Sequence, residues 1–172
     1  EDFFESCKAA ATIGTLQAGL NKFPYLGEVT ERIVKRESLL GVSICGIFNS
    51  PDVLLNAENQ REGAEVVKQQ NKILAGIIGI PTAARTTCLK PEGTGSKVLG
   101  SFPGVSPGHS RRFIQNVQAK DNEEPLKFLK MFNPAACEKS KWSKSGEDEV
   151  VKFCVEMDGN IITKDDIDAV GL

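Results

Sequence analysis

The order of hydrophobic patterns along this chain predicts a fold of the α/β class. Residues 41–48 are apolar on both faces, which is typical of a buried parallel strand. A long helical pattern follows, and residues 86–89 are then rich in β-branched and apolar side chains, which favours a second strand. Because a strand, a helix and a second strand form a crossover unit, we expect the two strands to be parallel neighbours whose carboxyl ends share one edge.

Three helices are predicted in the first half of the chain. Small and apolar residues recur at three- and four-residue steps over residues 3–20 and indicate a helix that packs closely against a neighbour. A second helix should begin near residue 27, and the longest periodic segment, residues 56–78, should form a third that ends at a glycine cap. The second helix is expected to direct three residues toward a core: Val29, Ile33 and Val34.

The second half of the chain predicts shorter elements. Residues 98–109 contain too many glycines and prolines for regular structure. The elements expected after them are a strand at 111–118, a helix at 125–132, a polar connection at 133–148, an alternating strand at 149–157, and a helix that starts at Thr163 with Asp165 and Asp166 in its first turn.

Length and charge restrict the classes of function. With 172 residues the chain fits one domain, and because it starts without a methionine we expect residues 1–172 to be a single partial domain, incomplete at both ends. A net charge of −2 argues against a nucleic-acid polymer as the main partner. The sequence has no apolar run long enough to span a bilayer, so a membrane partner is not expected.

The cysteines indicate a reducing compartment and no metal site. Five cysteines are widely spaced without any Cys-x-x-Cys pair, which fits a cytoplasmic protein better than a disulfide framework. Because the chain has a single histidine and its cysteines are widely spaced, a zinc site is not expected.

The loop after the second predicted strand is the candidate ligand site. Proline and two glycines stop the strand, and the glycines let backbone N–H groups approach a ligand closely. Thr94 and Ser96 add hydroxyl donors that an anion such as phosphate can use. The same composition is also typical of a plain turn, and the pattern is neither a Walker loop nor Gly-x-Gly-x-x-Gly. From the residues alone, both interpretations stay open.

Several stretches together resemble one family, the adenosylcobalamin-dependent (class II) ribonucleotide reductases, in the later part of their catalytic chain. They are ATIGTLQA at 11–18, FPYL at 23–26, ESLLGVSICG at 37–46, ARTTCLKPEGTGS at 84–96, SRRFI at 110–114, WS at 142–143 and TKDD at 163–166. The resemblance extends over essentially the whole chain. It implies that these residues contribute later strands and helices to a ten-stranded α/β barrel.

The resemblance also implies a role for the loop. It should hold the phosphates of a ribonucleoside di- or triphosphate through Pro91, Glu92, Gly93, Thr94, Gly95 and Ser96. Four cations are candidates to offset phosphate charge, or else are solvated surface cations: Lys90, Lys97, Arg111 and Arg112. The further partners implied are adenosylcobalamin, a thioredoxin-like or dithiol reductant, and the remainder of the reductase chain. Relatives commonly have a histidine where Ser106 stands, and His109 is not assumed to replace it.

No catalytic residue is expected within the chain. In the family, a thiyl radical forms on a cysteine within an Asn-x-Cys-x-Glu pattern. The only Cys-x-Glu here is Cys154 followed by Glu156, and Lys152 stands where the pattern has Asn, so we expect the radical cysteine upstream of Glu1. Four other cysteines are interpreted as small apolar residues that fill space: Cys7, Cys45, Cys88 and Cys137.

Three functions follow as alternatives. The chain is the substrate-phosphate part of a ribonucleotide reductase, inactive by itself because the radical cysteine is absent. The second alternative is a nucleotide-binding fragment with no catalytic activity of its own, and the third is a degenerate product without function. Turnover of ribonucleotides by these 172 residues alone would contradict the first alternative.

Overall fold

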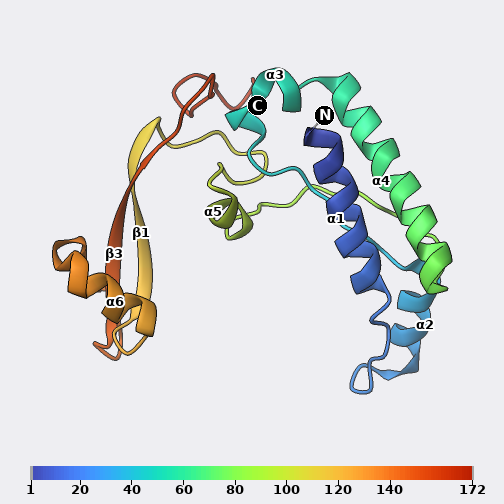
Figure 1. The fold of residues 1–172 in the computed structure, drawn as a ribbon, viewed down its shortest axis with the longest axis horizontal. Helices are drawn as coiled ribbons and strands as arrows, with labels where there is room; N and C mark the ends of the chain where they lie inside the picture. Colours follow the sequence, from blue (N-terminus) through green and yellow to red (C-terminus); the bar gives the residue numbers. More distant parts are fainter. Residues whose placement is uncertain (1, 172) are drawn as a thin grey trace.

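The computed structural model describes residues 2–171 of the chain. Its elements, in order, are α1 (Asp2–Ala18), α2 (Gly27–Glu37), the 3₁₀ helix η1 (Ile47–Asn49), α3 (Pro51–Leu54), α4 (Ala57–Ile78), α5 (Gly95–Leu99), β1 (Arg112–Lys120), α6 (Glu124–Phe132), the 3₁₀ helix η2 (Pro134–Ala136), β2 (Cys137–Lys139) and β3 (Asp148–Glu156). They lie along an open arc, with α1, α2 and α4 at one end, β1, β3 and α6 at the other, and α5 between them (Figure 1).

The helical pair, α1 and α4, packs through small and uncharged residues. Cys7, Ala11 and Val67 form a buried cluster between the two helices. A Cβ atom on Gly63 would lie 2.8 Å from Phe3 Cε1 and 3.3 Å from Cys7 Sγ, so this glycine lets side chains of α1 pack directly against α4. The prediction of both helices is confirmed, and α4 has the expected glycine cap, because Gly79 is left-handed and donates to the Ala75 carbonyl oxygen.

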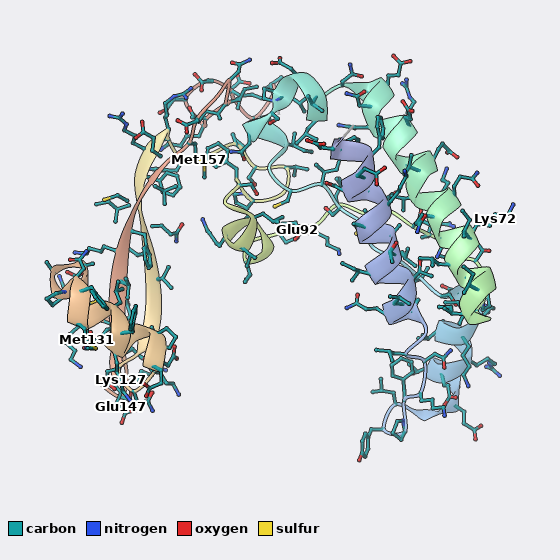
Figure 2. All side chains as sticks on the ribbon, viewed as in Figure 1. Lys72, Glu92, Lys127, Met131, Glu147 and Met157 are labelled. Atoms are coloured by element: carbon teal, nitrogen blue, oxygen red, sulfur yellow. The ribbon has the colours of Figure 1, made fainter. Side chains whose placement is uncertain are left out.

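The β arm, which consists of β1, β2, β3 and α6, forms the other end of the arc (Figure 1). Its three strands form an antiparallel sheet in the order β1-β3-β2. Lys127 and Met131 on α6 lie at the outer end of the molecule, while Met157 lies where β3 returns to the centre (Figure 2). The predicted strands and α6 are confirmed, whereas the short strand β2 falls in a segment predicted to be an irregular connection.

A central core joins the two ends. Ile47, Phe48, Phe102 and Ile161 are buried together there. The Phe102 amide donates to Asn49 Oδ1 at 2.7 Å, which fixes the chain that leaves α5 against η1. These residues come from distant parts of the sequence, so the junction is formed by long-range packing.

The strands predicted at 41–48 and 86–89 and the helix predicted at Thr163 are not formed within the described residues. In residues 86–89 only Thr87 takes part in a bridge. Residues 41–48 form one parallel bridge, between Val42 and Thr87, and then turn into η1 rather than continuing as a strand, since Gly46 adopts a left-handed φ of 68°. At Thr163 the chain makes turns and no helix. The Asp166 carboxylate accepts from the Thr163 amide, as the third residue of a capping box would, but it also accepts from the Thr163 hydroxyl, which in a capping box would itself accept from a backbone N–H.

The apolar face of α2 is not covered by the described residues. Val29 is 60% exposed and Ile33 is 41% exposed, so their predicted burial is not seen, whereas Val34 is half-buried as expected. A ten-stranded barrel is likewise not formed within residues 2–171, where the one sheet has three strands. Within the same residues, no helix is both long and apolar enough to cross a bilayer.

Candidate functional site

The two segments predicted as strands run side by side before they reach the candidate loop. The Leu40 amide donates to the Arg85 carbonyl oxygen at 3.0 Å, and the Val42 amide donates to that of Thr86 at 3.0 Å. The Cys88 amide donates back to the Val42 carbonyl oxygen at 3.0 Å. The predicted parallel arrangement is therefore confirmed, and it brings the start of the loop to the carboxyl end of this short pairing.

The loop itself turns sharply at Glu92. This residue has a left-handed φ of 52°, which is uncommon outside glycine. Gly93 and Thr94 continue the turn, and Gly95 is the first residue of α5. Of the predicted loop at 91–96, the last two residues are therefore helical.

Ser96 stabilises the loop from within. Its side chain is fully buried, and its hydroxyl donates to the Gly93 carbonyl oxygen at 3.2 Å. The Ser96 carbonyl oxygen accepts from the Ser101 amide at 2.9 Å. In this conformation the Ser96 hydroxyl donates within the loop and is not available as a donor to a ligand. The sequence alone does not distinguish these two roles of the hydroxyl.

The exposed edge of the loop offers several donors. In the described part of the chain, no protein acceptor is recorded for the amides of Gly93, Thr94 and Gly95. The Thr94 side chain is exposed and makes no hydrogen bond to the described residues. Three neighbouring N–H groups and one hydroxyl therefore remain for an outside acceptor.

Glu92 places a negative charge beside these donors. Its carboxylate lies over Gly95, because a Cβ atom on that glycine would be 2.9 Å from Glu92 Oε2. The side chain is half-buried and points between α5 and α1 (Figure 2). There it borders a hollow of about 290 Å³ with Gln17, Ser43 and Lys90. No cation of the described residues pairs with Glu92. The negative charge of its carboxylate would repel an anion, so that charge must be neutralised by a cation or the side chain must move away before an anion binds close to it.

Gly104 supports the loop from behind, and sequence reasoning did not single it out. Its φ is 45°, and a Cβ atom there would lie 2.4 Å from the Lys90 carbonyl oxygen and 3.0 Å from that of Pro91. Only glycine permits this contact. The sequence shows only a dense run of glycines and prolines at 98–109. This run does not indicate which of its residues contacts the loop.

The four candidate cations lie in different surroundings. Lys90 borders the hollow beside Glu92, and Lys97 Nζ lies 5.9 Å from the centroid of the Phe113 ring. Arg111 donates to the carbonyl oxygens of Met157 and Gly159 at 3.3 and 3.0 Å, and Arg112 pairs with Glu156 at 2.6 Å. Lys90 therefore lies beside the loop, and Lys97 follows the loop in sequence with its ammonium group over the Phe113 ring of β1. Both arginines already have partners at the start of the β arm.

The thiols are dispersed. All five cysteines are free. Cys7 is buried in the helical pair, where burial raises the pKa of its thiol, which agrees with a space-filling role. Cys88 and Cys154 are exposed, so the same interpretation is wrong for Cys88. Among the described residues no three His, Cys, Asp or Glu side chains come close enough together to hold a metal ion.

Comparison with known proteins gives one informative result. No family model matches the sequence, and no curated protein matches it. Among solved structures, a crystal structure of a B12-dependent (class II) ribonucleotide reductase aligns with 95% of this chain at a TM-score of 0.66 and 18% sequence identity. The chain has the fold of part of this reductase. The aligned part is 26% of the reductase chain, so these residues span about a quarter of its length.

Proposed function

We propose that this chain is the substrate-phosphate-binding part of a B12-dependent ribonucleotide reductase, which reduces ribonucleotides to deoxyribonucleotides by thiyl-radical chemistry. The observation that carries the proposal is the agreement of fold over 95% of the chain with such an enzyme. The position of the 91–96 loop, directly after a parallel pairing, supports it, since ligands of α/β folds bind at the carboxyl ends of strands.

The loop would bind phosphate through its free donors. The amides of Gly93, Thr94 and Gly95 and the Thr94 hydroxyl are available to phosphate oxygens. Lys90 and Lys97, on either side of the loop, would offset the charges of the phosphates and of Glu92. Binding would orient the rest of the nucleotide toward reacting groups held elsewhere in the enzyme.

The exposed apolar faces support the idea of a larger barrel. Ile13 on α1, Ile33 on α2, and Ile73 and Ile77 on α4 are largely exposed within the described residues. Burial of such side chains stabilises a protein by about 1.5 to 3 kcal/mol each. We therefore propose that residues 1–172 are a partial domain of a ten-stranded α/β barrel, and that the remainder of the reductase chain covers these faces.

We assign no site for adenosylcobalamin to the described residues. Five hollows that these residues border measure about 290 to 590 Å³, in the lower half of the range of about 300 to 1,000 Å³ for pockets of drug-sized ligands. A corrin with its nucleotide is larger than such a ligand. The proposal accordingly assigns corrin binding, the radical cysteine and the contacts with a dithiol or thioredoxin-like reductant to the remainder of the enzyme.

Thr94 provides the test. In the full-length enzyme, Thr94→Ala should weaken ribonucleotide binding about fivefold, which corresponds to the loss of one hydrogen bond of about 1 kcal/mol. Thr94→Ser, which keeps the hydroxyl, should bind normally. Calorimetric titration with a ribonucleoside di- or triphosphate measures both variants.

The matched control is Thr82→Ala, since Thr82 is exposed, lies before the loop and makes no side-chain hydrogen bond to the described residues. Equal affinities of Thr94→Ala, Thr82→Ala and the natural sequence would refute phosphate binding by this loop.

A further inference from the structure

A second hollow lies between α5, β1 and the turn that follows β3. It measures about 480 Å³, within the range of small-molecule sites. Its lining combines cationic, amide and aromatic side chains: Lys97, Phe102, His109, Phe113, Gln115 and Lys164. No acidic residue borders it in the described part of the chain.

The floor of this hollow is tightly built. Phe102 is buried, and its ring lies so close to Gly108 that a Cβ atom there would be 2.0 Å from Phe102 Cζ. The Gly108 carbonyl oxygen accepts from the Lys164 amide at 2.8 Å, and Gly108 pairs with Thr163 in a parallel bridge. The backbone that presents Lys164 is therefore held directly against the apolar floor.

The cations on the rim differ from the lysines that form ion pairs within the described chain. Lys8, Lys68 and Lys127 each pair with a glutamate three residues away at 2.6 to 2.7 Å. Lys97 and Lys164 have no carboxylate partner among residues 2–171. An exposed lysine without a partner is ordinary, but two that border one concave apolar surface produce a local positive potential.

Lys164 also borders another, neighbouring hollow, whose other charged residues are Asp165, Asp166 and Asp168. None of these three carboxylates borders the hollow shared with Lys97 or forms an ion pair with Lys164. The Asp166 carboxylate is engaged by the Thr163 amide and hydroxyl at 2.8 and 2.7 Å. The charged side chains that line the hollow itself are therefore cationic, and the nearest carboxylates lie beyond Lys164.

We propose that this hollow is a binding site for a small organic anion, in which a phosphate or carboxylate group is joined to an apolar body. Lys97, Lys164 and the His109 imidazole bind the anionic group, and the apolar body rests on Phe102 and the prolines beside it. The site goes beyond the phosphate-loop proposal. The two sites share Lys97, but the lining of this hollow contains none of residues 91–96, so it does not depend on phosphate binding by the loop.

Phenyl phosphate is the probe for this site, titrated calorimetrically into the full-length protein. It should bind more tightly than inorganic phosphate, which lacks the apolar body, and more tightly than phenol, which lacks the charge. Binding should weaken as salt is raised, because the rim is exposed to solvent. Equal affinities for phenyl phosphate and phenol, or no binding of either, would overturn the proposal.

Lys164→Gln distinguishes this site from the loop. The variant should weaken phenyl phosphate binding about tenfold, through loss of a charge-assisted contact. The matched control is Lys120→Gln, because Lys120 is an exposed, unpaired lysine of β1 that does not border the hollow. Thr94→Ala should leave phenyl phosphate binding unchanged. If Thr94→Ala weakens it and Lys164→Gln does not, the anion binds at the loop and the second site is refuted, while the loop proposal survives.

Discussion

The helical pair and the β arm are stabilised by different kinds of interaction. In the helical pair, Asn71 is fully buried, its amide donates to Thr15 Oγ1 at 3.0 Å, and its carbonyl oxygen accepts from the Ala83 amide at 3.0 Å. Thr15 in turn donates to the Ala11 carbonyl oxygen at 2.7 Å. This neutral network connects α1, α4 and the segment that leads to the candidate loop.

The β arm instead relies on charge. Glu149 on β3 is only 5% exposed, and its carboxylate pairs with Lys130 of α6 at 2.6 Å and with Lys139 of β2 at 3.3 Å. The hydrogen bond from Lys130 holds the pKa of the Glu149 carboxyl below its ordinary value. Asp121 and then Glu149 raise the pKa of Lys139. One carboxylate thus attaches both α6 and β2 to the central strand.

Because of this difference, the two ends should respond differently to changes of pH and salt concentration. Neutral hydrogen bonds inside the helical pair change little with pH or salt, whereas the ion pairs of the β arm depend on the charge of Glu149 and are partly screened. The part that positions the candidate loop is therefore the less sensitive of the two.

Substitution of Asn71 should produce the largest effect. Asn71→Ala removes both hydrogen bonds, leaves the Ala83 amide without its acceptor and opens a cavity. We expect a loss of about 2 to 4 kcal/mol in the free energy of unfolding, measured by urea titration with circular dichroism. Gln69→Ala, on the exposed side of α4, is the control and should change stability by less than about 0.5 kcal/mol. Similar values for the two variants would show that the neutral network does not stabilise the helical pair.

The same contrast explains which parts of the fold the sequence predicts. The helices α1 and α4 follow from local periodicity and a glycine cap, and β3 follows from the alternation of its side chains. The antiparallel pairing of β3 with β1 joins segments separated by α6, η2 and β2, and was not predicted. Residues 41–48 failed as a strand because strands need neighbours, and only the short segment around Thr87 lies beside them in the described chain.

For the candidate site, the sequence predicts where the loop lies but not the contacts that hold its conformation. The sequence indicates where a strand ends and a loop begins, and the parallel pairing confirms that position. It does not reveal that the Ser96 hydroxyl bonds within the loop or that Gly104 supports the loop from behind, because both depend on contacts formed in three dimensions. The hollow beside Lys164 likewise joins segments more than forty residues apart in sequence, which no local pattern connects.

Acid should loosen the β arm before the helical pair. Because the pKa of Glu149 is lowered, its stabilisation is present above the ordinary carboxyl pKa and is lost as pH falls through the folded-state pKa. The raised pKa of Lys139 means that its contribution is lost only at high pH. Hydrogen exchange of the β1 and β3 amides at neutral and acidic pH should show lower protection in acid, with α1 and α4 less affected.

Glu149→Gln sharpens this prediction, since the amide keeps the shape and removes the charge. The variant should lose protection in the β arm at neutral pH and show little further loss in acid. The control is Glu124→Gln, because Glu124 is exposed and pairs only with Lys127 on the same helix. A β arm that stays equally acid-sensitive in Glu149→Gln would assign the effect to other carboxylates.

The smallest expected effect is a gain within the helical pair. Gly76 lies inside α4, and a Cβ atom there would meet nothing within 4 Å. Gly76→Ala should therefore raise the free energy of unfolding by about 0.5 to 1 kcal/mol, since alanine loses less backbone entropy in a helix. Gly63→Ala is the matched comparison on the same helix and should destabilise, because its Cβ atom would meet the Phe3 ring at 2.8 Å. Opposite signs in urea titrations of the two variants would show that close contact with α1, rather than helix propensity, requires glycine at position 63, whereas a gain in both would contradict the tight packing of this pair.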